Sequence, residues 1–208
     1  KGSKVHNSLE NSINDANGYI KIEGKSDEYV RLYTVSDIIK NHDYGKLDYD
    51  KFQYTVMAQK YPTIKEGVEK LCQQGYSIYA EIVVYDVRSL ICGMIDVLLV
   101  NWETHDFIIL DWKTNNKPLM FESGYFRRDA FGYWADFVPN SNMMKYPFNK
   151  YPDAVGYHYT MQLSLYAYLL EQFGLKCKAL RLCHIYSNKK TELEEINLSD
   201  YVLKKNIF

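Results

Sequence analysis

Hydrophobic positions recur at helical spacing in several parts of the chain. Val5, Leu9 and Ile13 lie four residues apart, as on one face of a helix. Ser36 and Asp37 could cap a short helix that reaches Lys40. The helices expected from these patterns cover about residues 3–15, 36–40, 63–74 and 154–173.

Extended segments rich in β-branched and aromatic residues lie between and after the later helices. They predict strands over about residues 76–87, 90–100, 107–112 and 178–185. The first three follow one another through short turns, which predicts an antiparallel meander. Helices before and after these strands indicate an α/β (α+β) protein.

Residues 115–153 follow neither pattern and form an insertion rich in aromatic residues and prolines. Cations interleave with its rings, an arrangement that suits single-stranded nucleic acid because bases stack on aromatic side chains. The alternative is an irregular subdomain whose rings form its own core. The candidate nucleic-acid-binding residues are Lys117, Tyr125, Arg127, Arg128 and Trp134.

Length and charge limit the classes of protein. The 208 residues, 47% hydrophobic and 25% charged, are expected to form one globular domain over residues 1–208. With 25 basic and 26 acidic side chains the net charge is -1, which excludes a polybasic nucleic-acid coat. A helix that begins almost at Lys1 suggests an N-terminus truncated from a longer chain, so an oligomer or a larger multidomain assembly stays open.

The spacing of the cysteines and the length of the apolar runs indicate the cellular compartment of the protein. The 4 cysteines lie far apart without a C-x2-C pair, which argues against a zinc site on such a pair and against a secreted disulfide framework. No apolar run reaches the length of a membrane span, and no signal peptide precedes the first helix. We therefore expect a soluble protein of the cytoplasm, with no membrane partner.

The strongest chemical signal is a pair of aspartates on neighbouring predicted strands. Asp96 lies inside an apolar run, and Asp111 ends the next strand. Buried carboxylates are costly unless they are paired or metal-bound, and two together favour a divalent cation such as Mg²⁺ or Mn²⁺. Lys113 lies on the same strand face as Asp111 and could orient a water or neutralise phosphate charge. A surface salt bridge between Asp111 and Lys113 is the alternative.

These motifs, in this order, resemble the PD-(D/E)xK nuclease superfamily and its RecB-like exonuclease branch. The resemblance comprises Gly93-x-Ile95-Asp96, then Asp111-x-Lys113, then Gln162-x-x-x-Tyr166 on a helix, preceded by Gly2-Ser3-x-x-His6-x-x-x-Glu10 and by Glu81 on the strand before. It implies a restriction-endonuclease-like αβββαβ core, with a mixed central sheet flanked by helices. Ile95 stands where the superfamily name has a proline.

The resemblance also implies roles for individual residues. His6, Asp96, Asp111 and the backbone carbonyl of Trp112 would bind the metal ion, and Lys113 would position the attacking water. Gln162 and Tyr166 would position the DNA backbone and the lysine side of the site. Glu10 and Glu81 would act as partners of the metal ligands or as ligands of a second metal ion.

The activity that the resemblance implies is metal-dependent hydrolysis of DNA, by an exonuclease rather than an endonuclease. Its relatives act in recombination, repair or replication, many of them phage-encoded, so the compartment would be a host cytoplasm. Some relatives hold an iron–sulfur cluster with late cysteines, of which only Cys177 and Cys183 are present, so no cluster is expected. The alternative is a catalytically silent module of nuclease-like fold that binds nucleic acid or protein.

Overall fold

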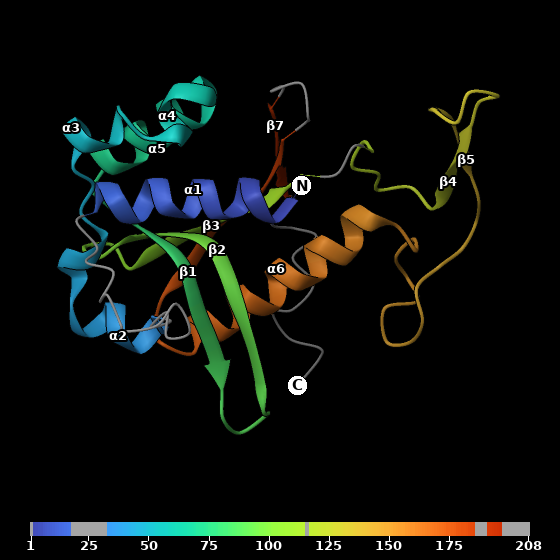
Figure 1. Ribbon diagram of the computed structural model, residues 1–208. Coiled ribbons are helices and arrows are strands. Elements are labelled where there is room, and N and C mark those ends of the chain that lie inside the picture. The colour runs from blue at the N-terminus through green and yellow to red at the C-terminus, as the bar shows by residue number, and fades with distance from the viewer. Residues whose placement is uncertain (1, 18–32, 115–116, 186–190, 197–208) are drawn as a thin grey trace, which may run out of the picture.

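The computed structural model describes residues 2–17, 33–114, 117–185 and 191–196 (Figure 1). Its helices are α1 (Gly2–Ala16), α2 (Val35–Lys40), α3 (Tyr49–Phe52), α4 (Val56–Lys60), α5 (Pro62–Gln73) and α6 (Val155–Glu171), with a 3-10 helix η1 (His42–Gly45). Its strands are β1 (Tyr76–Asp86), β2 (Ile91–Asn101), β3 (Asp106–Lys113), β4 (Gly124–Arg128), β5 (Trp134–Pro139), β6 (Lys176–Ile185) and β7 (Thr191–Ile196).

Five of these strands form one mixed sheet in the order β1-β2-β3-β6-β7. Neighbours are antiparallel except β3 and β6, which run parallel. The parallel pair requires a crossover, and α6 provides it. The predicted meander is therefore confirmed, and the protein is of the α+β class with a mixed sheet and flanking helices.

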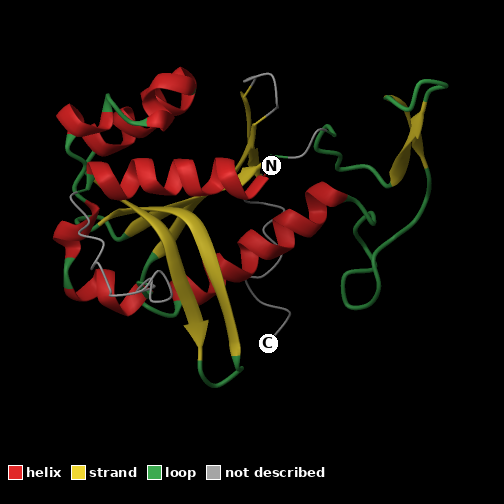
Figure 2. Ribbon diagram, viewed as in Figure 1, coloured by secondary structure: helices red, strands yellow, loops and turns green. Residues whose placement is uncertain are grey.

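Helices cover both faces of this sheet (Figures 1 and 2). On one face α1 and α5 pack against the sheet and α4 packs on these two helices, with Leu9 and Ile13 of α1 fully buried. On the other face α2 and α6 pack against it, with Leu163 and Leu170 of α6 fully buried. We call these faces the α1 side and the α6 side. Burying one such side chain contributes about 1.5–3 kcal/mol, so the two layers of apolar side chains hold the helices in place.

Several predicted elements are found close to their expected bounds, and some differ. The helices over 3–15, 63–74 and 154–173 correspond to α1, α5 and α6, and the four predicted strands to β1, β2, β3 and β6. The short helix begins earlier than expected, because Thr34 and not Ser36 is its N-cap. Thr34 and Asp37 form a capping box, in which each side chain meets the other residue's backbone N–H.

Four short elements were not expected. Three are helices between residues 19 and 60, and the fourth is a strand that follows β6. The helices η1, α3 and α4 are too short to produce a periodic pattern, and β7 extends the sheet past β6. In the parts of the chain that the structure describes, no helix is long and apolar enough to cross a membrane.

The insertion over residues 115–153 contains a separate two-stranded sheet, β4 and β5. This hairpin extends to one side of the body, away from the five-stranded sheet (Figure 1). Its aromatic residues divide between two roles. Phe126 and Phe137 pack on each other with ring centroids 5.1 Å apart, whereas Phe131 and Tyr133 are exposed. A core of its own therefore accounts for only part of the ring content.

Candidate functional site

The strands β2 and β3 separate at the two predicted aspartates. Their antiparallel ladder ends at the pair Val97 and Leu110. Beyond this pair β2 continues alongside β1, and β3 continues alongside β6 as far as Lys113. Asp96 and Asp111 are the first residues of their strands past the last shared pair, so both carboxylates lie where the two strands part.

Asp96 connects three elements at this point. Its Oδ2 accepts a hydrogen bond from the backbone N–H of Trp112 at 2.8 Å, in place of a ladder bond between β2 and β3. The same oxygen lies 3.6 Å from Nδ1 of His6, on α1. The expected grouping of His6, Asp96 and Trp112 is therefore present in space. The Trp112 group that faces Asp96 is its amide nitrogen.

Asp111 is buried, with 4% of its surface exposed, and its environment disfavours the charged form. Burial is the main cause and the charge of Asp96 the next, and together they raise the pKa of Asp111 to about 6. Lys113, through its charge and its hydrogen bond, and to a smaller extent His6 lower the pKa of Asp111. A buried carboxylate whose pKa is raised by a neighbouring carboxylate forms a site that favours a cation.

Lys113 contacts Asp111 and an aromatic ring. Its Nζ lies 2.6 Å from Oδ2 of Asp111, and only 15% of the lysine side chain is exposed. The same Nζ lies 4.1 Å from the ring centroid of Tyr159, on α6, a cation–π distance. This pair is not the exposed salt bridge that was the alternative interpretation: the ammonium is held between a buried carboxylate and an aromatic face.

Gln162 and Tyr166 lie one turn apart on α6 and contact each other. Nε2 of Gln162 donates a hydrogen bond to the Tyr166 hydroxyl at 2.9 Å. The ring of Tyr166 lies against Gly93 of β2, where a Cβ atom would overlap it. Both residues are therefore held on the α6 side of the sheet, next to the strand that carries Asp96.

Glu81 has an unusual backbone in the middle of β1. Ile78 and Ala80 pack on the α1 side, whereas Ile82 and Val84 pack on the α6 side. In a regular strand all four would share one face, so β1 exchanges faces at Glu81. Glu81 itself has a φ of 49°, in the left-handed region that a side chain disfavours.

The neighbouring strand makes the same exchange. Val97 of β2 packs on the α1 side and Ile95 on the α6 side, so β2 exchanges faces at Asp96. The β1–β2 register is the same before and after, and the pair of Glu81 with Asp96 is the one missing from the ladder. Glu81, Asp96 and Asp111 thus occupy one row across three neighbouring strands, at the point where two of them change face.

The remaining candidate residues lie on other elements than this row. Glu10 follows His6 by one turn of α1. Tyr125, Arg127 and Arg128 lie in β4, on the projecting hairpin. Lys117 precedes that hairpin, and Trp134 begins β5, with its side chain outside the described part of the structure.

The ligand atoms at the site are of the chemical type that a hard divalent cation prefers. They are carboxylate oxygens with one imidazole nearby, the ligands that suit Mg²⁺ or Mn²⁺. Oδ2 of Asp111 is buried and, apart from its ion pair with Lys113, accepts no well-aligned hydrogen bond. As the side chains stand, however, no three His, Cys, Asp or Glu residues of the described segments form a group that could hold a metal ion.

Comparison with models of protein families and with curated proteins finds no match for this chain. The contacts of the site are therefore the basis on which its function is inferred.

Tyr159 is a site residue that the sequence analysis did not single out. It precedes Gln162 by three residues, a spacing that places two side chains on one face of a helix. That spacing alone does not distinguish it from the other tyrosines of α6, because Tyr157, Tyr166 and Tyr168 have similar neighbours in sequence. Its role depends on Lys113, which a different element supplies.

Proposed function

We propose that this chain is a metal-dependent DNA nuclease of the PD-(D/E)xK type, similar to the RecB-like branch. The observation that carries the proposal is the meeting of Asp96, Asp111 and Lys113 where β2 and β3 separate. The order of α1, β1, β2, β3, α6 and β6 supports the restriction-endonuclease-like core that the motifs imply.

Each part of the site has a task in phosphodiester hydrolysis. A Mg²⁺ or Mn²⁺ ion held by Asp96 and Asp111, with His6 beside them, would supply an activated water and neutralise charge on the scissile phosphate. The Lys113 ammonium, fixed by Asp111 and Tyr159, would orient the water and donate a hydrogen bond to a phosphate oxygen. The new bond joins the water oxygen to phosphorus, and the bond to the leaving sugar oxygen breaks.

Exonuclease action on DNA ends is proposed ahead of internal cleavage, on the likeness to the RecB-like branch alone. The competing function is a silent module that binds nucleic acid or protein. The two differ in what Lys113 contributes: a module needs no ammonium against a buried carboxylate, whereas hydrolysis does.

The test is cleavage of end-labelled single-stranded and duplex DNA with Mg²⁺ or Mn²⁺. We expect release of label that EDTA abolishes and that Lys113→Ala lowers by about 100-fold or more, the range for a positioned catalytic group. Lys46→Ala removes a lysine that is also ion-paired with an aspartate, but exposed, and should leave the rate unchanged. Absence of cleavage with both metals, or equal cleavage by Lys113→Ala, contradicts the proposal and favours the silent module.

A further inference from the structure

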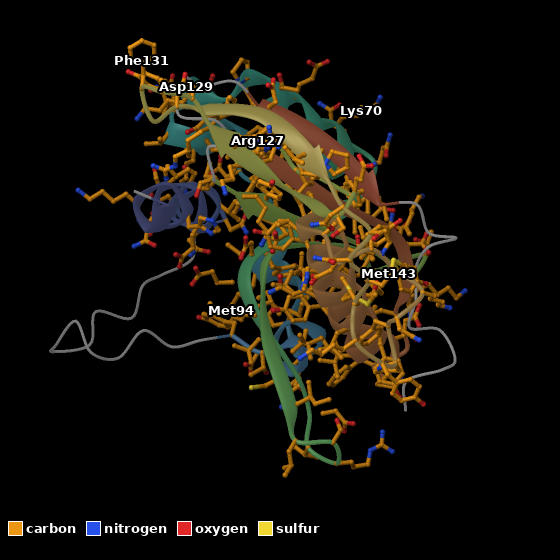
Figure 3. The ribbon with its side chains drawn as sticks, turned by 90° about the vertical axis from the view of Figure 1, so that its right-hand side faces the viewer. Lys70, Met94, Arg127, Asp129, Phe131 and Met143 are labelled. Carbon is orange, nitrogen blue, oxygen red and sulfur yellow. The ribbon has the colours of Figure 1, made fainter. Side chains whose placement is uncertain are left out.

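We propose that the β4–β5 hairpin is an arm that binds single-stranded nucleic acid by stacking bases on Phe131 and Tyr133. The inference rests on the proposed nuclease function and deepens it, because it names single strands as the substrate class. Figure 3 shows the hairpin from its outer side, with Phe131 at its end and Arg127 on β4.

The two rings at the hairpin end are strongly exposed. Phe131 is 86% exposed and Tyr133 is 73% exposed, while Tyr125 of β4 is 54% exposed. Single exposed rings are common on protein surfaces, but these two lie two residues apart in one turn. The rings that support the hairpin are different ones, Phe126 and Phe137, which pack on each other.

The backbone presents these rings in a defined turn. Oδ1 of Asp129 accepts hydrogen bonds from the backbone N–H groups of Phe131 and Tyr133, each at 2.9 Å. Between them Gly132 has a φ of 82°, which glycine adopts without strain. The Asp129 carboxylate is thereby bonded to the turn itself, next to the positive charges of Arg127 and Arg128 on β4.

The arm and the candidate site are joined through α6. At the base of the arm, the N–H of Gly156 donates to the carbonyl of Met120 at 2.8 Å, and the Phe121 ring packs on Gly156 and on Tyr157. Two residues later on the same helix, Tyr159 contacts Lys113. A strand held by the arm would therefore be held on the element that also fixes the lysine of the site.

Exposed rings next to arginines suit single strands rather than duplexes. Every base has a flat face that can stack on a ring whatever the sequence, and the guanidinium group of Arg127 can meet a phosphate. In a duplex these faces are already stacked on one another, so the rings would find no free base. Single-stranded DNA and RNA share this chemistry.

Binding of labelled oligo(dT), oligo(U) and a DNA duplex of equal length, measured by fluorescence anisotropy in EDTA, tests the inference. The variant Phe131→Ala/Tyr133→Ala should weaken binding of the single strands by about tenfold or more and leave duplex binding unchanged. Tyr54→Ala removes an equally exposed ring, 74% exposed, in the turn between α3 and α4, and should bind as the wild type does. The ratio of the oligo(dT) and oligo(U) affinities identifies the kind of strand.

Equal affinity of the double variant and the wild type for single strands overturns the inference, as does equal loss on the duplex. If the double variant instead changes the oligomeric state in sedimentation and not the affinity for oligo(dT), the hairpin is a protein contact. Because binding is measured in EDTA, without a metal ion, a loss of binding can be distinguished from a loss of cleavage. Binding through the hairpin without any nuclease activity contradicts the proposed function alone, whereas unchanged digestion of single strands by the double variant contradicts the arm alone.

Discussion

Gly93 of β2 lies so close to Tyr166 of α6 that the aromatic ring occupies the space of a side chain at position 93. The contact joins the strand that carries Asp96 to the helix that carries Gln162. The Tyr166 hydroxyl is also the acceptor for Gln162, so the position of the ring determines the position of that amide. The close packing of Tyr166 therefore explains why the first position of the Gly-x-x-Asp motif is a glycine in this fold.

Gly93→Ala should destabilise the protein and displace Tyr166. A Cβ atom there overlaps the ring, and forcing extra atoms into a packed core costs about 1–3 kcal/mol. Chemical denaturation measures the loss in the free energy of unfolding. Adding Tyr166→Ala to the same chain removes the overlapping ring, so the two changes together should cost less than the sum of the single changes.

The matched control is Gly67→Ala, in α5. A Cβ atom at Gly67 meets nothing within 4 Å, so the same chemical change adds no overlap. Alanine is the better helix former, and the variant should gain about 0.5–1 kcal/mol. If the two alanine variants lose stability equally, the contact with Tyr166 does not explain the glycine at position 93.

Asp111→Asn should make the metal-free protein more stable at pH 8 and change it little at pH 4. The pKa of Asp111 rises from 3.8 to about 6 on folding, because of burial and then the charge of Asp96. Between these pH values the folded state binds more protons than the unfolded state, so the free energy of unfolding falls as pH rises through the window. Above this pH window the ionised carboxylate of the wild type lowers the free energy of unfolding by about 3 kcal/mol, a loss that the neutral amide of asparagine avoids.

Urea denaturation in EDTA at several pH values measures this difference. The stability curves of wild type and Asp111→Asn should separate between about pH 4 and pH 6 and stay apart at higher pH. A wild type that is more stable than the variant at pH 8 would mean that Lys113 more than compensates the burial of the carboxylate.

Much of the fold could be predicted from the sequence because its long elements have strong periods. The α1 pattern of Val5, Leu9 and Ile13 buries one face of the helix, whereas the continuous apolar runs of β2 and β3 are buried on both faces of the sheet, so each pattern reports its structure. The helices η1, α3 and α4 last about one turn, too short for a period to develop. The β7 strand is defined by its pairing with β6, which depends on the whole sheet and leaves no local pattern in the sequence.

The aspartates of the site could also be predicted, whereas their surroundings could not. A charged residue inside an apolar strand pattern indicates Asp96, and one at the end of the next such pattern indicates Asp111. The face exchange at Glu81 and Asp96 leaves only a weak trace in sequence, the run Ile82, Val83 and Val84 after an alternating stretch. The contact of Tyr159 with Lys113 depends on how α6 crosses the sheet, which no local pattern encodes.

Tyr159→Leu should lower stability and Tyr159→Phe should not. Leucine keeps apolar volume but removes the aromatic face that lies 4.1 Å from the Lys113 Nζ, whereas phenylalanine keeps the ring. A cation–π contact of a largely buried lysine contributes about 0.5–2 kcal/mol. Thermal denaturation of both variants measures it, and equal stability of the two would show that the ring face contributes nothing.

Mg²⁺ or Mn²⁺ should stabilise the wild type and not Asp111→Asn. A ligand that binds only the folded state at about 100 times its dissociation constant adds about 2.7 kcal/mol to the free energy of unfolding. The variant loses one of the two carboxylates that would hold the ion. Differential scanning fluorimetry with and without the ions measures the shift. Asp43→Asn, whose exposed carboxylate pairs with Lys46, should keep the shift of the wild type, whereas an equal shift in Asp111→Asn would point to nonspecific binding.

Glu81→Gly should stabilise the protein while Glu81→Ala should not. Glu81 adopts a φ of 49°, which costs a residue with a side chain about 1 kcal/mol and costs glycine nothing. Alanine keeps the strain and removes only the carboxylate, so it separates the backbone effect from the charge. A gain with glycine and none with alanine, measured in urea, would show that strain is stored beside Asp96. If Glu81→Gly also lowers metal-dependent cleavage as far as Glu81→Ala does, the carboxylate of Glu81 belongs to the site. The backbone strain is then the loss of stability that placing this carboxylate in the site requires. Equal stability of the glycine and alanine variants would contradict the strain itself.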